Sequence, residues 1–175
     1  IANFFKRKLH RTPYINTALN TTKGGETSSH GGEVVATQKH LNTMPIDPQI
    51  LKHIRQITNT ETRFAACIMR TKHLSFLLVT FYLKSGEGVS ESNLTRLLQI
   101  NILRKLLNMP FIALGDLNIT PEELQDSGWL SILDSRFKLT PHPTSTKSSP
   151  NRHIDMCLYS IAIQHIILSL GIDLT

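Results

Sequence analysis

The stretch that decides the fold of this chain is Phe111-Ile112-Ala113-Leu114-Gly115-Asp116-Leu117-Asn118. Four consecutive apolar residues predict a buried strand, and the glycine is expected to end it. Asp116 and Asn118 follow two positions apart, and on an extended backbone such positions point to the same side. We therefore expect a carboxylate and a carboxamide to be held rigidly at the end of a core strand. Gly115 would let a ligand approach the backbone there.

The composition bounds the class of protein. The chain has 175 residues, enough for one domain with a sizeable core, and 40% of them are hydrophobic, as in ordinary globular proteins. Its formal net charge of +6 and isoelectric point of about 9.6 are compatible with a polyanionic partner such as nucleic acid. Cys67 and Cys157 lie in apolar segments without metal-ligand spacing, so we expect buried free thiols. The longest apolar stretch, 161–170, is too short and too polar to span a membrane, so no membrane partner is expected.

Upstream of the Gly-Asp stretch, the sequence predicts a polar start followed by strands. Residues 1–33 are rich in Thr, Asn, Gly and Ser, and we expect 1–30 to be flexible. Val34–Thr37 is predicted as a short strand, and Asp47 as the cap of a short helix that begins with proline. The segments 64–69 and 74–83 are predicted as strands, and the second is apolar almost throughout, which suits a central strand covered on both faces.

Downstream elements complete an α/β unit. A helix beginning at Ser90 or Ser92 is predicted to lead directly into the strand at 111–114. We expect its buried face to be formed by the residues that recur at the three-four spacing, which are Leu94, Leu97, Leu98, Asn101, Ile102 and Leu106. The segment Arg152–Ser160 is predicted as a later strand, and it carries a second carboxylate at Asp155.

Asp116 and Asn118 are open to two interpretations. Gly-Asp-x-Asn is good turn material, so the pair can simply form an Asx-turn after a strand. Alternatively, the pair can form a site for a hard cation and a phosphate, because Mg²⁺ prefers oxygen ligands and one or two carboxylates suffice to bind it. In that case the amide of Asn118 would donate to a phosphoryl oxygen, while Asp116 orients or deprotonates a water molecule.

Four segments resemble motifs of one superfamily and follow its order. Residues 110–121, with Gly-Asp-Leu-Asn at their centre, resemble the Gly-Asp-Phe/Leu-Asn motif of endonuclease/exonuclease/phosphatase proteins, the DNase I-like metal-dependent phosphoesterases. Val79–Tyr82 resembles the family strand that ends in an active-site Tyr or His, Gly31–Val35 resembles its Gly-Gly-Val strand start, and Arg152–Ser160 resembles its Arg-Ile-Asp-Tyr-Ile-Leu-Val-Ser motif. The resemblance covers residues 30–170 and is closest to the endonuclease domains of retrotransposons.

This resemblance implies the fold class. It predicts an α/β sandwich, in which two mixed β-sheets pack face to face with helices on the outside, as a single domain over residues 1–175. The chain shows neither the family's upstream Gln-Glu motif nor its terminal Ser-Asp-His motif. We therefore expect a partial domain whose sheets lack strands from each end.

The resemblance also implies an activity and the residues that carry it. The family activity is the hydrolysis of a phosphodiester in nucleic acid, here DNA in preference to RNA, with Mg²⁺ or Mn²⁺ as the cofactor. Asp116 would activate the attacking water and bind the metal, and Asn118 would bind the scissile phosphate. Tyr82 would contact the phosphate through its hydroxyl, and Asp155 would support the catalytic histidine or the metal.

Two of the implied roles have plain structural alternatives. Tyr82 can instead be a core tyrosine with a solvated tip. Arg152 is expected to contact the nucleic-acid backbone, although a solvated arginine fits the sequence equally well. His153 stands where the family often has Arg, and we place it with Arg152 among the substrate-binding candidates.

The missing motifs lead us to expect impaired hydrolysis, because the metal-binding Glu and the catalytic His act as a unit with the residues that are present. Two other functions therefore stay open. One is a catalytically inactive domain of the same fold that binds nucleic acid or protein, and the other is a phosphatase that acts on a small phosphoester. An intracellular, nuclear location is expected for a nuclease of this kind, and the oligomeric state is left open.

Overall fold

The computed structural model describes residues 6–7, 9, 11–16, 19–23, 26–30, 32–144 and 153–167, with only the backbone of 19–23 and 26–30. Its elements in chain order are β1 (Arg11–Asn16), β2 (Leu19–Lys23), β3 (Glu26–His30), β4 (Glu33–Gln38), β5 (Thr43–Pro45), α2 (Pro48–Thr58), β6 (Phe64–Arg70), β7 (Ser75–Tyr82), α3 (Glu91–Leu107), β8 (Phe111–Asp116), α4 (Pro121–Asp126), α5 (Trp129–Ile132), β9 (Ser135–Leu139), β10 (Asp155–Ser160) and the 3-10 helix η1 (Ile161–Ile166).

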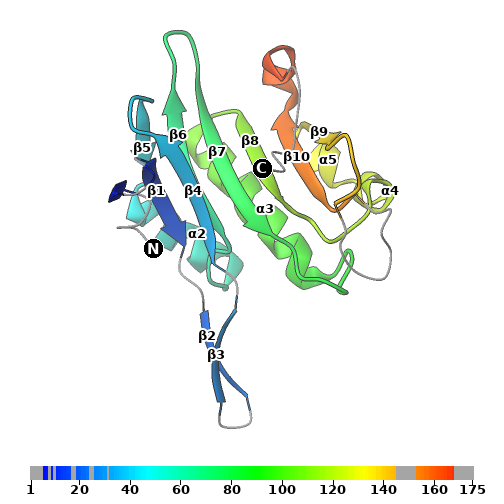
Figure 1. Cartoon of the computed structure of the whole chain (residues 1–175). Coiled ribbons are helices and arrows are strands. Elements are labelled where there is room, and N and C mark those ends of the chain that lie inside the picture. The colour runs from blue at the N-terminus through cyan, green and yellow to red at the C-terminus, as the bar shows by residue number, and fades with distance from the viewer. Residues whose placement is uncertain are drawn as a thin grey trace.

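A six-stranded mixed sheet forms the centre of the molecule (Figure 1). Its strand order is β5-β6-β7-β8-β10-β9, and every neighbouring pair is antiparallel except β7 and β8. That parallel pair is joined through α3, which is the α/β unit predicted from the sequence. The strands predicted at 64–69, 74–83 and 111–114 are confirmed as β6, β7 and β8.

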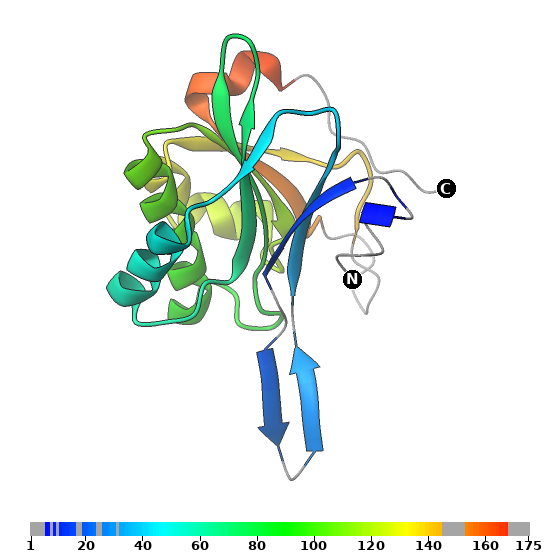
Figure 2. The same cartoon turned by 90° about the vertical axis from the view of Figure 1, so that its left-hand side faces the viewer.

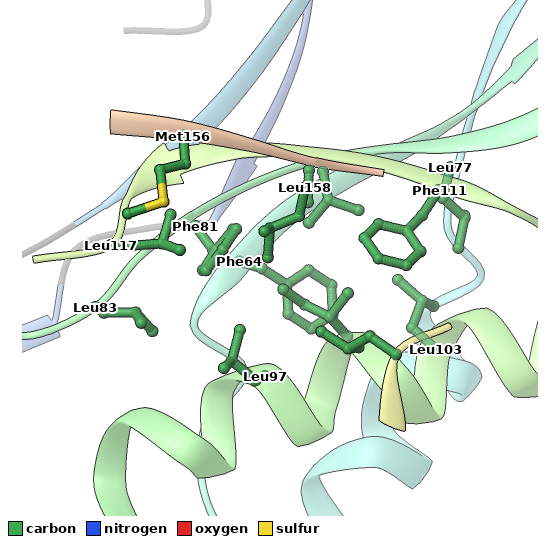
Figure 3. Close-up of a cluster of buried hydrophobic side chains, with 14 of the residues drawn as sticks. Phe64, Leu77, Phe81, Leu83, Leu97, Leu103, Phe111, Leu117, Met156 and Leu158 are labelled. Carbon is green, nitrogen blue, oxygen red and sulfur yellow. The ribbon is translucent and has the colours of Figure 1, made fainter. Parts of the chain in front are cut away.

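Helices cover one face of this sheet, which we call the helix face. Their starts are set by the residues that the sequence indicates: the side chain of Asp47 accepts from the backbone N–H of Gln49, and Ser90 accepts from that of Asn93. Between α3 and the sheet lies the main core, where large apolar side chains meet with almost no exposed surface (Figure 3). This packing fixes β7, β8 and β10 relative to one another.

A two-stranded antiparallel ribbon of β1 and β4 packs on the opposite face, which we call the ribbon face (Figure 2). Val35 of the ribbon is buried with Ala65 and Cys67 of β6, and Tyr14 packs against them. The hairpin of β2 and β3 extends from this ribbon, away from the sheets. The predicted sandwich with helices outside is thus confirmed, with a second layer of two strands over β6 and β7.

The buried face of α3 differs from the predicted one. Leu97 is buried as expected, but Leu98 and Leu106 are 37% and 46% exposed, and Ile100 and Leu103 are buried in their place. The apolar residues of α3 are spread around the helix rather than gathered in one stripe, so the three-four spacing fits more than one face. The contact with the sheet decides between them.

The polar segment before Val34 holds three strands, β1, β2 and β3, that we did not predict. Its Thr, Asn and Ser residues do not show the alternation of apolar and polar residues that marks a half-buried strand. The flexibility expected for residues 1–30 stays a prediction. Both cysteines are buried free thiols, as expected. Within the described ranges, no helix has the length and apolar character needed to cross a membrane.

Candidate active site

Three of the predicted site residues lie side by side at one end of the six-stranded sheet. They lie on β7, β8 and β10, which are neighbours in the sheet (Figure 1). Tyr82, the last residue of β7, is opposite Asp116, the last residue of β8, and Asp116 is opposite Asp155, the first residue of β10. Directly opposed residues in a sheet point to the same face. Since their neighbours Phe81 and Met156 are buried in the core beneath the helices, the three side chains lie on the ribbon face. We call this set the site row.

Gly115 holds β8 against β7 immediately before the site row. A Cβ atom at this position would lie 2.1 Å from the carbonyl oxygen of Phe81, so only glycine fits. The sequence suggested that the glycine ends the strand and admits a ligand, but β8 continues through Gly115 to Asp116. The close approach is made by the backbone of the neighbouring strand, which corrects that expectation.

The turn after the site row confirms the Asx-turn interpretation. The backbone N–H of Asn118 donates to Oδ1 of Asp116 at 3.0 Å, and Asn118 has a left-handed backbone with φ of 50°. The expected extended backbone is therefore wrong at this residue. The side-chain amide of Asn118 donates to the carbonyl oxygen of Leu83 at 2.9 Å, which joins the turn to the chain just after Tyr82. An Asx-turn and a place beside the site row are thus compatible.

Asp116 is a half-buried carboxylate beside a second carboxylate. Burial raises the pKa of Asp116 above its usual value, and the charge of Asp155 raises it further, while the hydrogen bonds from Asn118 lower it. The ionised form is therefore destabilised by its surroundings. A bound cation or a proton would relieve this.

Two buried polar residues of α3, which the sequence did not single out, shape the loop after Tyr82. Asn93 is 1% exposed and joins three backbone atoms: it accepts from the N–H of Lys84 at 2.8 Å and donates to the carbonyl oxygens of Lys84 and Gly88. Arg96 donates to the carbonyl oxygen of Tyr82. The sequence carries no signal that separates these two residues from the other polar residues of α3, and their burial is explained by their hydrogen-bond partners.

Glu33 is a second residue that sequence reasoning did not place in the site. It begins β4, is 5% exposed, and its Oε2 accepts from the side chain of Asn16 at 2.8 Å. The same amide of Asn16 donates to the carbonyl oxygen of Thr62, just before β6. Among the residues that the structure describes, Glu33 Oε1 and the Nε and Nη1 atoms of Arg63 are buried without a hydrogen-bond partner. Buried polar atoms are normally bonded, so water would be expected to bind here, beside the site row.

Thr144 lies against the start of β10, next to the site row. The hydroxyl of Thr144 accepts from the backbone N–H groups of Ile154 and Asp155 at 3.2 and 3.0 Å. His153 is half-buried two positions before Asp155, and its Nδ1 lies 3.5 Å from the hydroxyl of Thr140. Arg152 lies outside the described residues, so its predicted contact with nucleic acid stays a prediction.

Solved structures with this arrangement of strands and helices establish the fold. The endonuclease domain of TRAS1, a telomere-specific non-LTR retrotransposon, aligns with a TM-score of 0.54 and 16% identity over 87% of this chain and 69% of its own. The human nocturnin catalytic domain aligns with a TM-score of 0.56 and 14% identity over 92% and 66%. Beta toxin from Staphylococcus aureus aligns with a TM-score of 0.51 and 13% identity over 85% and 63%. The chain has a DNase I-like fold.

The chain shares the DNase I-like fold with these solved structures at low sequence identity. No protein-family model matches this chain, and no curated protein sequence does so. The likeness inferred from the Gly-Asp-Leu-Asn stretch and from Arg152–Ser160 is confirmed as a likeness of fold. Because this chain spans about two thirds of these neighbours, their activities are not carried over with the fold.

The side chains of the site row can be compared with the ligands that a metal ion requires. Asp116 and Asp155 are adjacent carboxylates, which is the donor type that Mg²⁺ prefers. Among the described residues, no group of three or more His, Cys, Asp or Glu is placed to hold a metal ion. Two carboxylates fit Mg²⁺ with several bound waters, whereas a dedicated protein cage is not built from the described chain.

Proposed function

We propose that the chain is a Mg²⁺-dependent phosphodiesterase that acts on nucleic acid at the site row. The observation that carries the proposal is the register of three strands, which puts Tyr82, Asp116 and Asp155 opposite one another on one face. These residues are far apart in the sequence. A phenol and two carboxylates at adjacent positions can bind a phosphate, activate a water and bind a hard cation.

Each residue of the site has a separate role in this proposal. Asp116 accepts a proton from the attacking water as the bond from water oxygen to phosphorus forms and the phosphoester bond breaks. The leaving oxygen takes a proton from solvent. Asn118 and Tyr82 donate to the non-bridging oxygens of the phosphate. The negative charge of Asp155 raises the pKa of Asp116, which favours its acceptance of the proton. Tyr82 is 37% exposed, so a substrate can reach it.

The cofactor of this activity would be Mg²⁺, or Mn²⁺ in its place. Asp116 would hold the ion with Asp155 beside it, and the ion would supply positive charge near the phosphate oxygens. With two carboxylates in place of a larger set of ligands, we expect weak metal binding and a low rate. DNA is the proposed substrate, and an intracellular, nuclear location remains an expectation of this function.

The experiment is a plasmid-nicking assay with and without Mg²⁺, run with the wild type and Asp116→Ala. Metal-dependent nicking that is lost in Asp116→Ala supports the proposal. The matched control is Asp126→Asn, an exposed carboxylate at the end of α4, which should nick like the wild type. Equal nicking by the wild type and Asp116→Ala would identify a contaminating nuclease and contradict the proposal.

The same assay separates the two other functions. Salt-sensitive DNA binding without nicking at high protein and Mg²⁺ would make the chain an inactive nucleic-acid-binding domain. Hydrolysis of a small phosphomonoester without nicking would make it a phosphatase. The site row is compatible with a small phosphoester, because a single phosphate is all that Tyr82 and Asn118 would contact.

A further inference from the structure

Two hydrogen-bonded turns at the end of the sandwich opposite the site row carry a cluster of basic side chains. The turn after β4 contains Lys39 and His40. Arg70 ends β6, and the turn that follows it contains Lys72 and His73. All five residues are exposed, and no acidic residue lies in 38–42 or 70–74. We call these five residues the basic end.

The register places both turns at the same end. Near the site row, Asn16 of β1 donates to the carbonyl oxygen of Thr62, which precedes β6. At the other end of the same strands, the hydroxyls of Thr37 and Thr43 are 3.2 Å apart, and Thr43 is opposite Met69. The backbone N–H of Arg70 then donates to the carbonyl oxygen of Asn42 at 2.9 Å. The two turns are therefore neighbours.

Both turns are held in one conformation by their own hydrogen bonds. The N–H of Leu41 donates to the carbonyl oxygen of Gln38 at 3.0 Å. In the second turn the N–H of Thr71 donates to the carbonyl oxygen of Leu74, and the Thr71 hydroxyl accepts from the N–H of Leu74 at 3.0 Å. No hydrogen bond or ion pair joins the side chains of Lys39, Arg70 or Lys72 to another described residue. The cluster is thus presented to solvent on fixed turns.

The site row has the opposite electrostatic character. Asp116 and Asp155 are adjacent, and Glu33 lies at the same end of the sandwich. Carboxylates attract a metal ion but repel the phosphates that flank a scissile bond. The cations at this end are engaged, because Arg96 is buried and donates to the carbonyl oxygen of Tyr82, and Lys84 is paired with Glu87 at 3.2 Å. Exposed positive charge elsewhere on the protein would therefore help to hold a polyanionic substrate in place.

We propose that the basic end binds the phosphate backbone of a nucleic acid at a distance from the site row. This rests on the proposed function, because the same strand would be cleaved at Asp116. Strand β7 runs from the basic end to Tyr82 over eight residues, which is about 26 Å at the usual rise. Phosphates of one duplex strand are spaced by about 3.4 Å along the axis. A duplex must therefore exceed about eight base pairs to reach both ends.

The test measures the binding of a 30-base-pair duplex by fluorescence anisotropy in EDTA, at a series of salt concentrations. The variant is Lys39→Gln/Lys72→Gln, and the matched control is Lys52→Gln/Lys105→Gln, which removes two exposed lysines from α2 and α3. We expect the basic-end variant to lose about 10-fold in affinity at 0.1 M salt, with a salt slope smaller by about 2. The control should keep the wild-type affinity and slope.

Binding in EDTA is independent of hydrolysis, so this inference and the proposed function can fail separately. Equal losses in the two variants would show a response to net charge alone and would overturn the inference. Complete competition by polyglutamate of equal charge would assign the basic end to an acidic protein and would also overturn it.

In a nicking-active protein, the basic-end variant should lower kcat/KM on the 30-base-pair duplex but not on a 6-base-pair hairpin. Equal effects on both lengths would contradict a contact remote from the site.

Discussion

The two faces of the six-stranded sheet are packed in different ways. On the helix face, Leu77, Phe111 and Leu158 have no exposed surface and belong to one large core. On the ribbon face, a small cluster around Val35 is buried over β6, while Leu114 of β8 is 39% exposed. The difference separates two tasks: the helix face supplies stability, and the ribbon face is free to present polar groups at its end.

The largest effect should come from two positions on β8, three residues apart, that point to opposite faces. We expect Phe111→Ala to lower the free energy of unfolding by about 4 kcal/mol, because it leaves a cavity in the core. Leu114→Ala, on the ribbon face, should cost less than about 1 kcal/mol, because its side chain is already partly in water. Urea denaturation of both variants measures the two values. Equal losses would mean that both faces stabilise the fold alike, against the comparison.

The next largest effect is expected within the sheet itself, where β8 contacts β7. Gly115→Ala should cost about 3 kcal/mol, because the new methyl group would collide with the Phe81 carbonyl oxygen and separate β8 from β7. Gly86→Ala is the control. Its φ of 77° is unfavourable for alanine, but no atom lies within 4 Å of the new Cβ, so about 1 kcal/mol is expected. Thermal or urea unfolding compares the two, and a Gly115→Ala protein as stable as Gly86→Ala would remove this account of the glycine.

A smaller effect is expected where the helix face supports the site. Asn93→Ala should cost about 2 kcal/mol, because three hydrogen bonds to the backbone at Lys84 and Gly88 are lost from a buried position. The loop after Tyr82 should become more mobile, and hydrogen exchange at Lys84 should accelerate more than exchange within β7. Uniform acceleration over both segments would show that Asn93 stabilises the whole domain rather than this loop.

The helix face was largely predictable because its signals are local. A continuous apolar run marks β7, and capping residues mark the starts of α2 and α3. Which residues of α3 are buried could not be predicted from the local sequence. Leu98 and Ile100 are both apolar, and only contact with the sheet distinguishes them. Sequence periodicity identifies a helix more readily than it identifies the face that packs.

The ribbon face was harder to predict, since it depends on register between distant segments. Asp116 and Asn118 were found from their spacing after an apolar run, and the roles of Tyr82 and Asp155 came from a resemblance to known motifs. The pairing of strands is what places Tyr82, Asp116 and Asp155 in a row. Glu33 was missed as a site residue because its position depends on a ribbon whose first strand has no apolar pattern. Its burial follows from the fold, since Glu33 points in the same direction as Val35.

The smallest effect concerns the charge that the ribbon face places at its end. Burial and Asp155 raise the pKa of Asp116, so the folded protein binds this proton more tightly than the unfolded chain does. Ionised Asp116 therefore costs stability above its unfolded pKa, and that cost fades as the pH falls through the raised folded pKa. We expect Asp116→Asn, which keeps an acceptor for the Asn118 N–H, to be more stable than the wild type at pH 7 by less than about 1 kcal/mol. Urea denaturation from pH 7 to pH 3.5 should show this advantage shrinking on acidification, and an advantage that grows would mean that Asp116 is stabilised as the carboxylate.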